Sequence, residues 1–387
     1  MFVVLFVVVI IGAIMLHEFG HFVTAKAFGM KVTQFFVGFG PTLWSTHKGE
    51  TEYGFKGIPA GGFVKIVGMT PWEDTDPADD GRLFYQQSPW KRLIVLSAGS
   101  FTHLVLAILM LFGALAFIGP GGGDATNQVA AVPADSPAAS AGLRPGDTIV
   151  AVDGRPTDTF EEVRSAVQDR FSDTIALSVV RGDREMALQA TLDVPHPEPE
   201  LAGVGYLGVA PRSENQPLGI VEGAQQTFSG PVSIGAITTA TIDGLAQVFS
   251  FDGLSQFFGS VGSDEPRQED SITSLVGAGQ IVNEFGNQGQ IFLVVLVLAQ
   301  LNLVLGILNM LPLPPLDGGH VAVMAVEETV NGVRQLRHPG AASRRPKFHL
   351  NPNIVTPIAL AVIAFFLVLS TTALYVDLTS PASHLVQ

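Results

Sequence analysis

Four long apolar stretches constrain the fold of this chain more strongly than any other feature of its sequence. Apart from Glu18 in the first stretch, their apolar cores contain no Asp, Glu, Lys or Arg. A helix crosses the hydrocarbon core of a bilayer with about 20 mostly apolar residues. The sequence therefore predicts a polytopic α-helical membrane protein with four transmembrane helices. We place these helices at residues 1–28, 92–119, 291–320 and 354–377.

Lysine and arginine residues predict the orientation of these helices. They flank the first two spans at Lys26, Lys31, Lys91 and Arg92. Because basic residues near the ends of spans favour the cytoplasmic side, we expect residues 29–91 to form a cytoplasmic loop. The basic segment 321–353 is expected on the same side. Both chain termini, and the block between the second and third spans, are then extracytoplasmic.

The outer block contains a segment with the pattern of a small, mainly β domain, which we place at 127–195. Short alternating runs at Thr148–Val152 and Ile175–Val180 predict strands, and Phe160–Val167 predicts a helix between them. The stretch Ser140–Gly154 resembles the signature of PDZ domains. That resemblance implies a domain that binds extended peptides by adding them as a strand to a sheet edge. The alternative is a small β domain of another type.

Two further segments adjoin the predicted spans. Residues 196–290 begin with a Pro-rich linker, and their apolar residues between Ile234 and Phe249 recur at helical spacing. We interpret this part as interfacial amphipathic helices on the outer membrane face, with helices packed on the protein's own core as the alternative. In the cytoplasmic loop, Thr51–Val67 contains two apolar runs separated by Gly61-Gly62, which predicts a membrane-associated β hairpin or small sheet.

The first span contains His17-Glu-Phe-Gly-His21, an H-E-x-x-H sequence. On a helix, residues i and i+4 share one face, so His17 and His21 can bind the same metal ion. Glu18 lies beside them, where it can accept a proton from water at that ion. A charged group within an apolar span costs at least about 2.5 kcal/mol, and polar residues that persist there are usually functional. The alternative is a helix that ends near Leu16 and leaves both histidines in solvent.

Two histidines leave a catalytic zinc site one protein ligand short, because such sites usually have three. The chain has no Cys, so the third ligand must be His, Asp or Glu. We favour Asp317, which follows a long uncharged stretch and completes a His-His-carboxylate set. His320 is a competing ligand. An N-terminal cap of the next helix is the alternative role for Asp317.

These motifs together resemble the site-2 proteases, a family of zinc intramembrane metalloproteases. The resemblance spans nearly the whole chain and is greatest to bacterial members with one PDZ domain, the regulator of sigma-E protease type. It includes the run Asn309-x-x-Pro-x-Pro-x-Leu-Asp317-Gly318, and Phe36–Trp44 is similar to actinobacterial members.

The resemblance implies a role for each matching residue. Zn²⁺ is bound by His17, His21 and Asp317, and Glu18 is the catalytic acid and base. The resemblance also implies that Asn309 helps to hold the unwound substrate. The residues assigned to substrate binding on this basis are Asn309, Pro312, Pro314, Gly318 and His103.

The second span departs from the family pattern at His103. Where the bacterial family usually has A-G-P-x-x-N, this chain has Ala98-Gly-Ser-Phe-Thr-His103. Histidine can donate a hydrogen bond as asparagine does, but it can also titrate or bind metal. Natural variation, a fourth metal ligand, and a lineage-specific or engineered change are all compatible with this substitution.

The sequence therefore predicts an intramembrane zinc endopeptidase of a bacterial plasma membrane, with membrane lipid around its spans. By resemblance, it cleaves single-span proteins of the anti-sigma factor type after a site-1 type protease has cut them outside. The PDZ domain then binds peptides or excludes bulky substrates. The net charge of −14, with only 21 Lys and Arg, argues against a nucleic-acid partner. The alternative is a catalytically silent membrane scaffold whose PDZ domain captures peptides. A metal transporter is a third and weaker alternative, because the polar residues of a transporter would be spread over several depths of the membrane.

Overall fold

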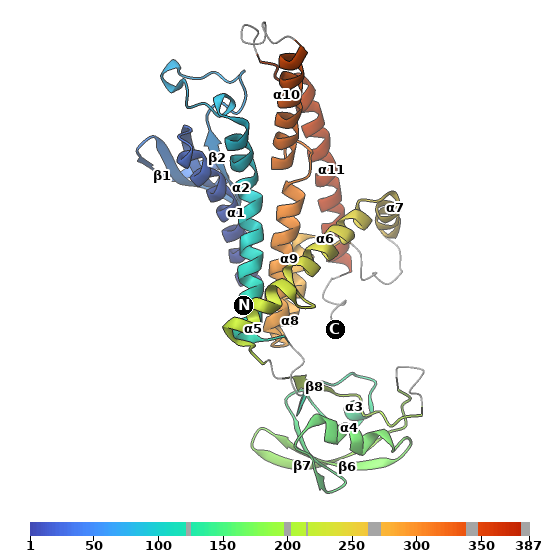
Figure 1. Cartoon of the computed structure of the whole chain (residues 1–387). Coiled ribbons are helices and arrows are strands. Elements are labelled where there is room, and N and C mark those ends of the chain that lie inside the picture. The colour runs from blue at the N-terminus through green and yellow to red at the C-terminus, as the bar shows by residue number, and fades with distance from the viewer. Residues whose placement is uncertain (121–124, 197–202, 214–215, 262–271, 338–346, 381–387) are drawn as a thin grey trace. The chain divides into compact units, whose positions relative to one another are not determined.

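The computed structural model describes residues 1–120, 125–196, 203–213, 216–261, 272–337 and 347–380 (Figure 1). The chain divides into two compact units. The larger unit comprises residues 1–113 and 224–387 and contains the long apolar helices. The smaller unit comprises residues 114–223 and contains a β sheet.

In the described part of the chain, four helices are long and apolar enough to cross a membrane. They are α1 (Phe2–Ala27), α2 (Pro89–Gly113, continued by a π-helical turn to Ile118), α9 (Ile291–Asn309) and α11 (Pro352–Thr379). Each contains most of one predicted apolar stretch, as expected for a multi-pass membrane protein.

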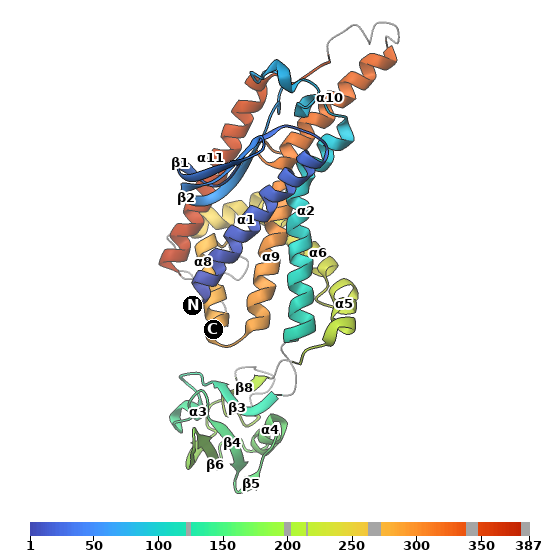
Figure 2. The ribbon, with the colours of Figure 1, turned by 90° about the vertical axis from the view of Figure 1, so that its left-hand side faces the viewer.

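Three of the spans pack side by side in the larger unit, with α2 in contact with both α1 and α9 (Figure 2). The approach of α1 to α2 is close at Gly20, where a Cβ would lie 2.8 Å from the carbonyl oxygen of Ala98. A further helix, α8 (Leu275–Asn287), packs against α1, α9 and α11. Phe6, Ile10 and Val282 are buried in this contact. The bundle thus fixes the face of α1 that contains the histidine pair.

The third span ends earlier than the sequence suggested. Helix α9 stops at Asn309, and a separate helix, α10 (Asp317–Arg337), begins after the turn at 310–316. Prolines at 312, 314 and 315 explain the break, because proline lacks the N–H of the helix ladder and disfavours the α conformation in the preceding residue. The structure therefore differs from the expected bound at 320, and much of the expected loop 321–353 is helical.

A two-stranded antiparallel sheet lies between α1 and α2 in sequence. Strand β1 (Val32–Lys48) pairs with β2 (Thr51–Ile66), and the chain turns at Gly49, whose φ of 66° favours glycine. A sheet was expected here, but its turn was expected at Gly61-Gly62. Those glycines instead lie within β2, where the pairing with β1 is irregular. Two short 3₁₀ turns, η1 (Pro77–Asp79) and η2 (Phe84–Gln86), precede α2.

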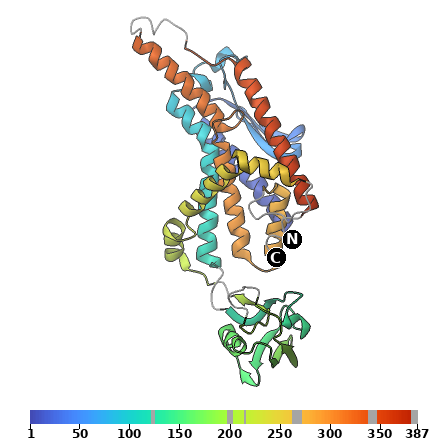
Figure 3. The ribbon, with the colours of Figure 1, turned by 90° about the vertical axis from the view of Figure 1, so that its right-hand side faces the viewer.

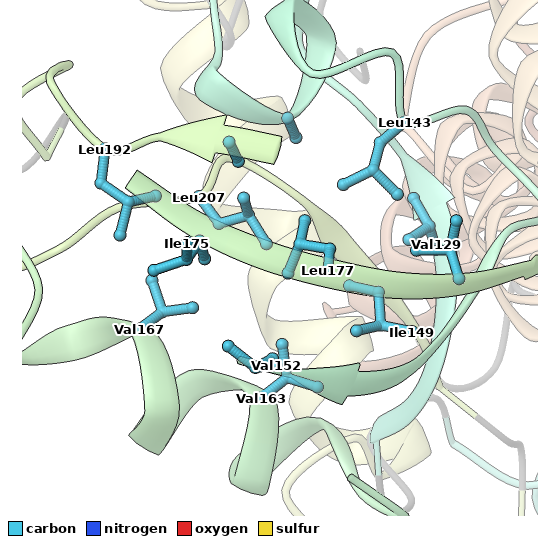
Figure 4. Packing of buried hydrophobic residues seen from close by; sticks show 13 residues of the cluster. Val129, Leu143, Ile149, Val152, Val163, Val167, Ile175, Leu177, Leu192 and Leu207 are labelled. Atoms are coloured by element: carbon cyan, nitrogen blue, oxygen red, sulfur yellow. The ribbon is translucent and has the colours of Figure 1, made fainter. Parts of the chain in front are cut away.

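The smaller unit is built on a six-stranded sheet of order β7-β6-β4-β3-β8, with β5 paired to β4. Its strands are β3 (Ala125–Ala131), β4 (Thr148–Val152), β5 (Arg155–Pro156), β6 (Thr174–Arg181), β7 (Arg184–Thr191) and β8 (Ala210–Ser213). Its short helices are α3 (Pro137–Ser140) and α4 (Phe160–Gln168). Buried side chains such as Ile149, Val163 and Leu177 form one core that joins the sheet to α4 (Figure 4).

The strands and the helix predicted from alternation in this unit are present as β4, β6 and α4. The sheet extends beyond the predicted bound at 195, because β8 pairs with β3. Most of the predicted Pro-rich linker at 195–200 lies outside the described residues. The PDZ assignment of this unit stays a prediction.

The segment predicted as amphipathic helices forms α5 (Gly219–Ser229), α6 (Ile234–Val248) and α7 (Phe251–Ser260), followed by α8. Helix α6 crosses α9 obliquely (Figure 3). Its residues Ile234 and Ile237 pack against buried Ala107 and Leu303, so this face covers the protein's own core. Other apolar side chains, including Phe251, are exposed. Residues 219–248 and 251–259, bent by 68° at the break, also meet the length and hydropathy criteria for one broken span.

Candidate metal centre

Three side chains predicted as metal ligands converge on one point. The carboxylate Oδ2 of Asp317 lies 3.2 Å from His17 Nε2 and 3.3 Å from His21 Nε2. The two histidine Nε2 atoms are 3.2 Å apart. Zinc–ligand bonds of 2.0–2.1 Å in a tetrahedron place neighbouring ligand atoms roughly 3.3 Å apart. The triangle therefore fits Zn²⁺, and within the described residues no other group of three His, Asp or Glu has its ligand atoms as close.

Helix α2 holds the histidine pair from one side. A Cβ on Gly99 would lie 2.5 Å from His21 Nε2 and would also meet the ring of His17, so only glycine fits between the helices at this position. One turn earlier, the carbonyl oxygen of Val95 accepts a hydrogen bond of 2.6 Å from His21 Nδ1. That bond puts the His21 proton on Nδ1 and leaves Nε2 available for a metal.

Asp317 is the first residue of α10, directly after the proline-rich turn. A Cβ on Gly318 would collide with the Met310 carbonyl, and one on Gly319 with the backbone of Pro314. The two glycines thus let the turn fold against the start of α10. Asp317 Oδ2 is buried and, apart from its contacts with the two histidines, has no hydrogen-bond partner. Its carboxylate faces the histidines, which favours the ligand role over the capping role.

Glu18 is half-buried beside this triangle. Its carboxylate interacts electrostatically with His17, His21 and Asp317, and with the backbone N–H of Val64. Strand β2 also passes close by, since a Cβ on Gly62 would lie 3.4 Å from Glu18 Cγ. The acid/base candidate therefore lies between the metal ligands and the edge of the β1–β2 sheet.

The other predicted site residues are only partly gathered around the triangle. Asn309 ends α9 and is half-buried. Pro312 and Pro314 lie in the turn 310–316, and Gly318 is the second residue of α10. Nothing in the structure tests their contact with substrate. His320 is exposed and lies outside the group of three ligands.

His103 also lies outside the three-ligand group. Its side chain is buried, its ring centroid is 5.2 Å from that of His17, and its Nδ1 lies 3.0 Å from Asn302 Oδ1. Sequence reasoning did not single out Asn302, although an amide side chain within an apolar span is a signal of the same kind as His17. It also did not single out Gly99, because a glycine in an apolar helix has no distinguishing pattern.

A buried ionic cluster holds α10 against α2. Arg92 of α2 lies 3.5 Å from Glu327 and 3.3 Å from Glu328 on α10. Glu327 also accepts a hydrogen bond of 3.0 Å from the backbone N–H of Leu350. Because Asp317 begins α10, this cluster helps to hold the third candidate ligand in place relative to the helix that supports the histidines.

Comparison with known proteins identifies the family. Residues 5–344 match the sequence model of peptidase family M50. The chain belongs to peptidase family M50. The expected resemblance to site-2 proteases is thereby confirmed, and the site that fits Zn²⁺ lies in the matched region.

Relatives of this M50 protein match it over almost their whole length. The zinc metalloprotease Rip1 of Mycobacterium tuberculosis (strain ATCC 25618 / H37Rv) is 34% identical over 405 residues, which cover 98% of this chain and 97% of Rip1. Rip1 of Mycolicibacterium smegmatis is 33% identical over 412 residues, with 98% of each chain covered. This M50 protein is therefore a zinc metalloprotease with Zn²⁺ as its cofactor.

One solved structure is similar to part of the chain. The PDZ domain of an SdrC-like protein from Listeria innocua is 21% identical and covers 23% of this M50 protein and 94% of that domain, with a TM-score of 0.20.

Proposed function

We propose that this M50 protease hydrolyses a peptide bond within the transmembrane segment of single-span membrane proteins. The position of the candidate ligands carries the proposal. His17 and His21 lie within the span α1, and Asp317 lies 3.2–3.3 Å from both of them after the end of the span α9. This position supports a reacting centre among the membrane helices, where a substrate helix can reach it from the bilayer.

The residues of the centre take distinct roles in this proposal. His17 Nε2, His21 Nε2 and Asp317 Oδ2 would hold the metal. When bound, Zn²⁺ supplies Lewis acidity, which polarises the scissile carbonyl and lowers the pKa of water to about 7. The Glu18 carboxylate accepts the proton of the attacking water on one Oε and passes it to the nitrogen of the leaving amine. Contact with β2 limits the positions that this carboxylate can take.

The substrate must unwind before it is cut, because i→i−4 hydrogen bonds occupy the carbonyl groups of a helix. Strand β2 passes beside Glu18 at Gly62 and Val64. A substrate segment added to the β1–β2 sheet would therefore be extended next to the acid/base. We assign the Asn309 side-chain amide to the exposed substrate backbone. Pro312, Pro314 and Gly318 form the turn that would border it.

The proposed orientation places the smaller unit and both termini outside the cytoplasm, in a bacterial plasma membrane. Acting as a PDZ domain, the smaller unit would exclude substrates with bulky outer domains or bind their shortened ends. A site-1 type protease would make that first cut. Proteins of the anti-sigma factor type are the proposed substrates, on the family resemblance alone.

A reporter with one transmembrane span, already trimmed outside, tests this function. We would co-express it with the wild type, with Glu18→Gln and with Glu161→Gln, a matched change on an exposed side chain of α4. Glu18→Gln removes the proton acceptor but keeps the three ligands. We expect cleavage by the wild type and by Glu161→Gln, and none by Glu18→Gln.

Equal cleavage by the wild type and Glu18→Gln would reject the mechanism. Zinc analysis of the purified proteins separates the proposed site from the scaffold alternative. The proposal requires bound zinc in the wild type and in Glu18→Gln, whereas wild type without zinc would favour the scaffold.

A further inference from the structure

The two metal-binding histidines differ in what holds their second ring nitrogen. His21 Nδ1 donates to the Val95 carbonyl at 2.6 Å, whereas His17 Nδ1 is buried and has no hydrogen-bond partner. A histidine that binds zinc through Nε2 carries its proton on Nδ1, and a partner for that proton orients the ring and strengthens metal binding. His17 lacks the partner that His21 has.

His103 is the side chain placed to provide this partner. It is 2% exposed, and its ring centroid lies 5.2 Å from that of His17 with a tilt of 41°. Two imidazole rings joined by an N–H···N hydrogen bond of about 3 Å have centroids roughly 5 Å apart. The separation therefore already matches, and a rotation of the rings is enough to complete the bond.

Asn302 determines which nitrogen of His103 is free to accept. Asn302 Nδ2 donates to the carbonyl of Leu298 at 2.9 Å, so its Oδ1 is the acceptor that faces His103. His103 Nδ1, 3.0 Å from that oxygen, must then carry the proton. In the neutral ring the other nitrogen, Nε2, is left as an acceptor.

We propose that His103 is a positioning residue for the zinc ligand His17. Its Nε2 accepts the hydrogen bond from His17 Nδ1, and Asn302 holds His103 in the tautomer that can do so. This inference rests on the proposed function, because it takes His17 as a ligand through Nε2. It also gives His103 a role toward the metal ligand rather than toward the substrate.

The test measures the zinc affinity of the full-length protein in detergent micelles, by competition with a chromophoric chelator. His103→Leu removes the acceptor and should weaken zinc binding by about 10- to 100-fold. His103→Gln can accept from His17 while it donates to Asn302, so it should restore most of the affinity. Ser100→Ala is the matched control, since this buried hydroxyl on the same helix has no hydrogen-bond partner; it should bind zinc as the wild type does.

The visible absorption of the Co²⁺-loaded protein gives a second readout, because it reports the geometry of the ligands. We expect His103→Leu to change this spectrum, whereas His103→Gln and Ser100→Ala should leave it unchanged. Equal zinc affinity in the wild type and His103→Leu, with affinity lost in His17→Ala, would overturn the inference and leave the proposed function standing. Equal weakening by Leu and Gln would also overturn it.

The proposed function fails separately, if His17→Ala and Asp317→Ala bind zinc as tightly as the wild type. If His103→Leu lowers the unfolding temperature of the metal-free protein, Asn302→Leu is used to separate general destabilisation from loss of the hydrogen bond to His17. This variant keeps His103 but frees its tautomer, so it should weaken zinc binding severalfold. Wild-type affinity in Asn302→Leu would then overturn the inference.

Discussion

Gly99 packs against the ring of His21 so closely that a Cβ on Gly99 would lie 2.5 Å from His21 Nε2. The same Cβ would meet the ring of His17. Helix α2 thus contacts both histidines at a residue without a side chain, and their Nε2 atoms can both face Asp317. The distance between two helices, rather than a side-chain contact, sets the geometry of two ligands.

Gly99→Ala should therefore weaken zinc binding without unfolding the bundle. The added methyl group pushes the histidine rings apart, so we expect zinc affinity and reporter cleavage to fall at least about tenfold. Gly113→Ala on the same helix is the control, because a Cβ there meets no atom within 4 Å. Both quantities are measured on purified protein in micelles. Equal affinity in the two variants would contradict the close packing at Gly99.

Zinc removal should abolish cleavage reversibly. A strong chelator is expected to stop reporter hydrolysis, and added Zn²⁺ to restore it.

Asp317→Asn keeps the shape of the third proposed ligand but removes its charge. The zinc affinity of this variant should fall by at least about 100-fold, more than the loss of an outer hydrogen bond causes. Asp243→Asn, on an exposed side chain of α6, is the control. Full zinc occupancy in Asp317→Asn would exclude Asp317 as a ligand.

Glu327→Ala should destabilise the larger unit. Both Arg92 and Glu327 are buried, so the substitution leaves the Arg92 guanidinium with only the more exposed Glu328 as an ionic partner. Breaking a buried ion pair costs about 3 kcal/mol. Unfolding in micelles, followed by circular dichroism, measures the loss. Glu328→Gln should cost less, because Glu328 is more exposed, and the reverse order would contradict the larger cost expected for the buried Glu327.

Glu50 should stabilise the fold in a pH-dependent way. Hydrogen bonds from Arg82 and then Lys26 lower the pKa of Glu50 from 4.5 to about 2. A lowered carboxyl pKa contributes stability that is complete above the unfolded value and is lost as the pH falls through the folded value. The difference in unfolding temperature between wild type and Glu50→Gln should thus be largest near neutral pH.

That difference should shrink between about pH 4.5 and pH 2. Glu161→Gln, the same change at an exposed position of α4, is the control for the substitution itself. A constant difference between wild type and Glu50→Gln over the whole range would show that the Glu50 ion pairs are not what stabilises the turn between β1 and β2.

The candidate metal ligands could be picked out from the sequence because each is a polar group in an apolar setting. His17 and His21 interrupt an otherwise hydrophobic span, and Asp317 follows an uncharged one. The structure brings the three together, as their residue types suggested. Gly99 and the Val95 carbonyl could not be found in this way, because backbone contributions leave no chemical pattern in a sequence.

The membrane spans were predictable from length and hydropathy, but two neighbouring features were not. Strand β1 contains Pro41 and two glycines, Gly38 and Gly40, which normally argue against a long strand, so its pairing with β2 was missed. The helix that begins at Asp317 was weighed only as the alternative in which Asp317 caps it, because the prolines before it look like the start of a loop. In both cases tertiary packing overrides a local signal.

The proline break after Asn309 has a consequence for how solvent reaches a reaction inside the bilayer. The N–H groups of this turn at Met310, Leu311, Leu313 and Leu316 are all hydrogen-bonded. Carbonyl groups that lose their helical partners remain, and hydrocarbon cannot satisfy them. At membrane depth such backbone persists only where protein buries it or where it lines a hydrated space. Met310 and Leu313 of this turn are 38% and 39% exposed, so burial alone does not cover it. If the proposed centre lies at membrane depth, the carbonyl groups of this break would therefore need water, which would also bring the hydrolytic reactant to Asp317 and the histidines.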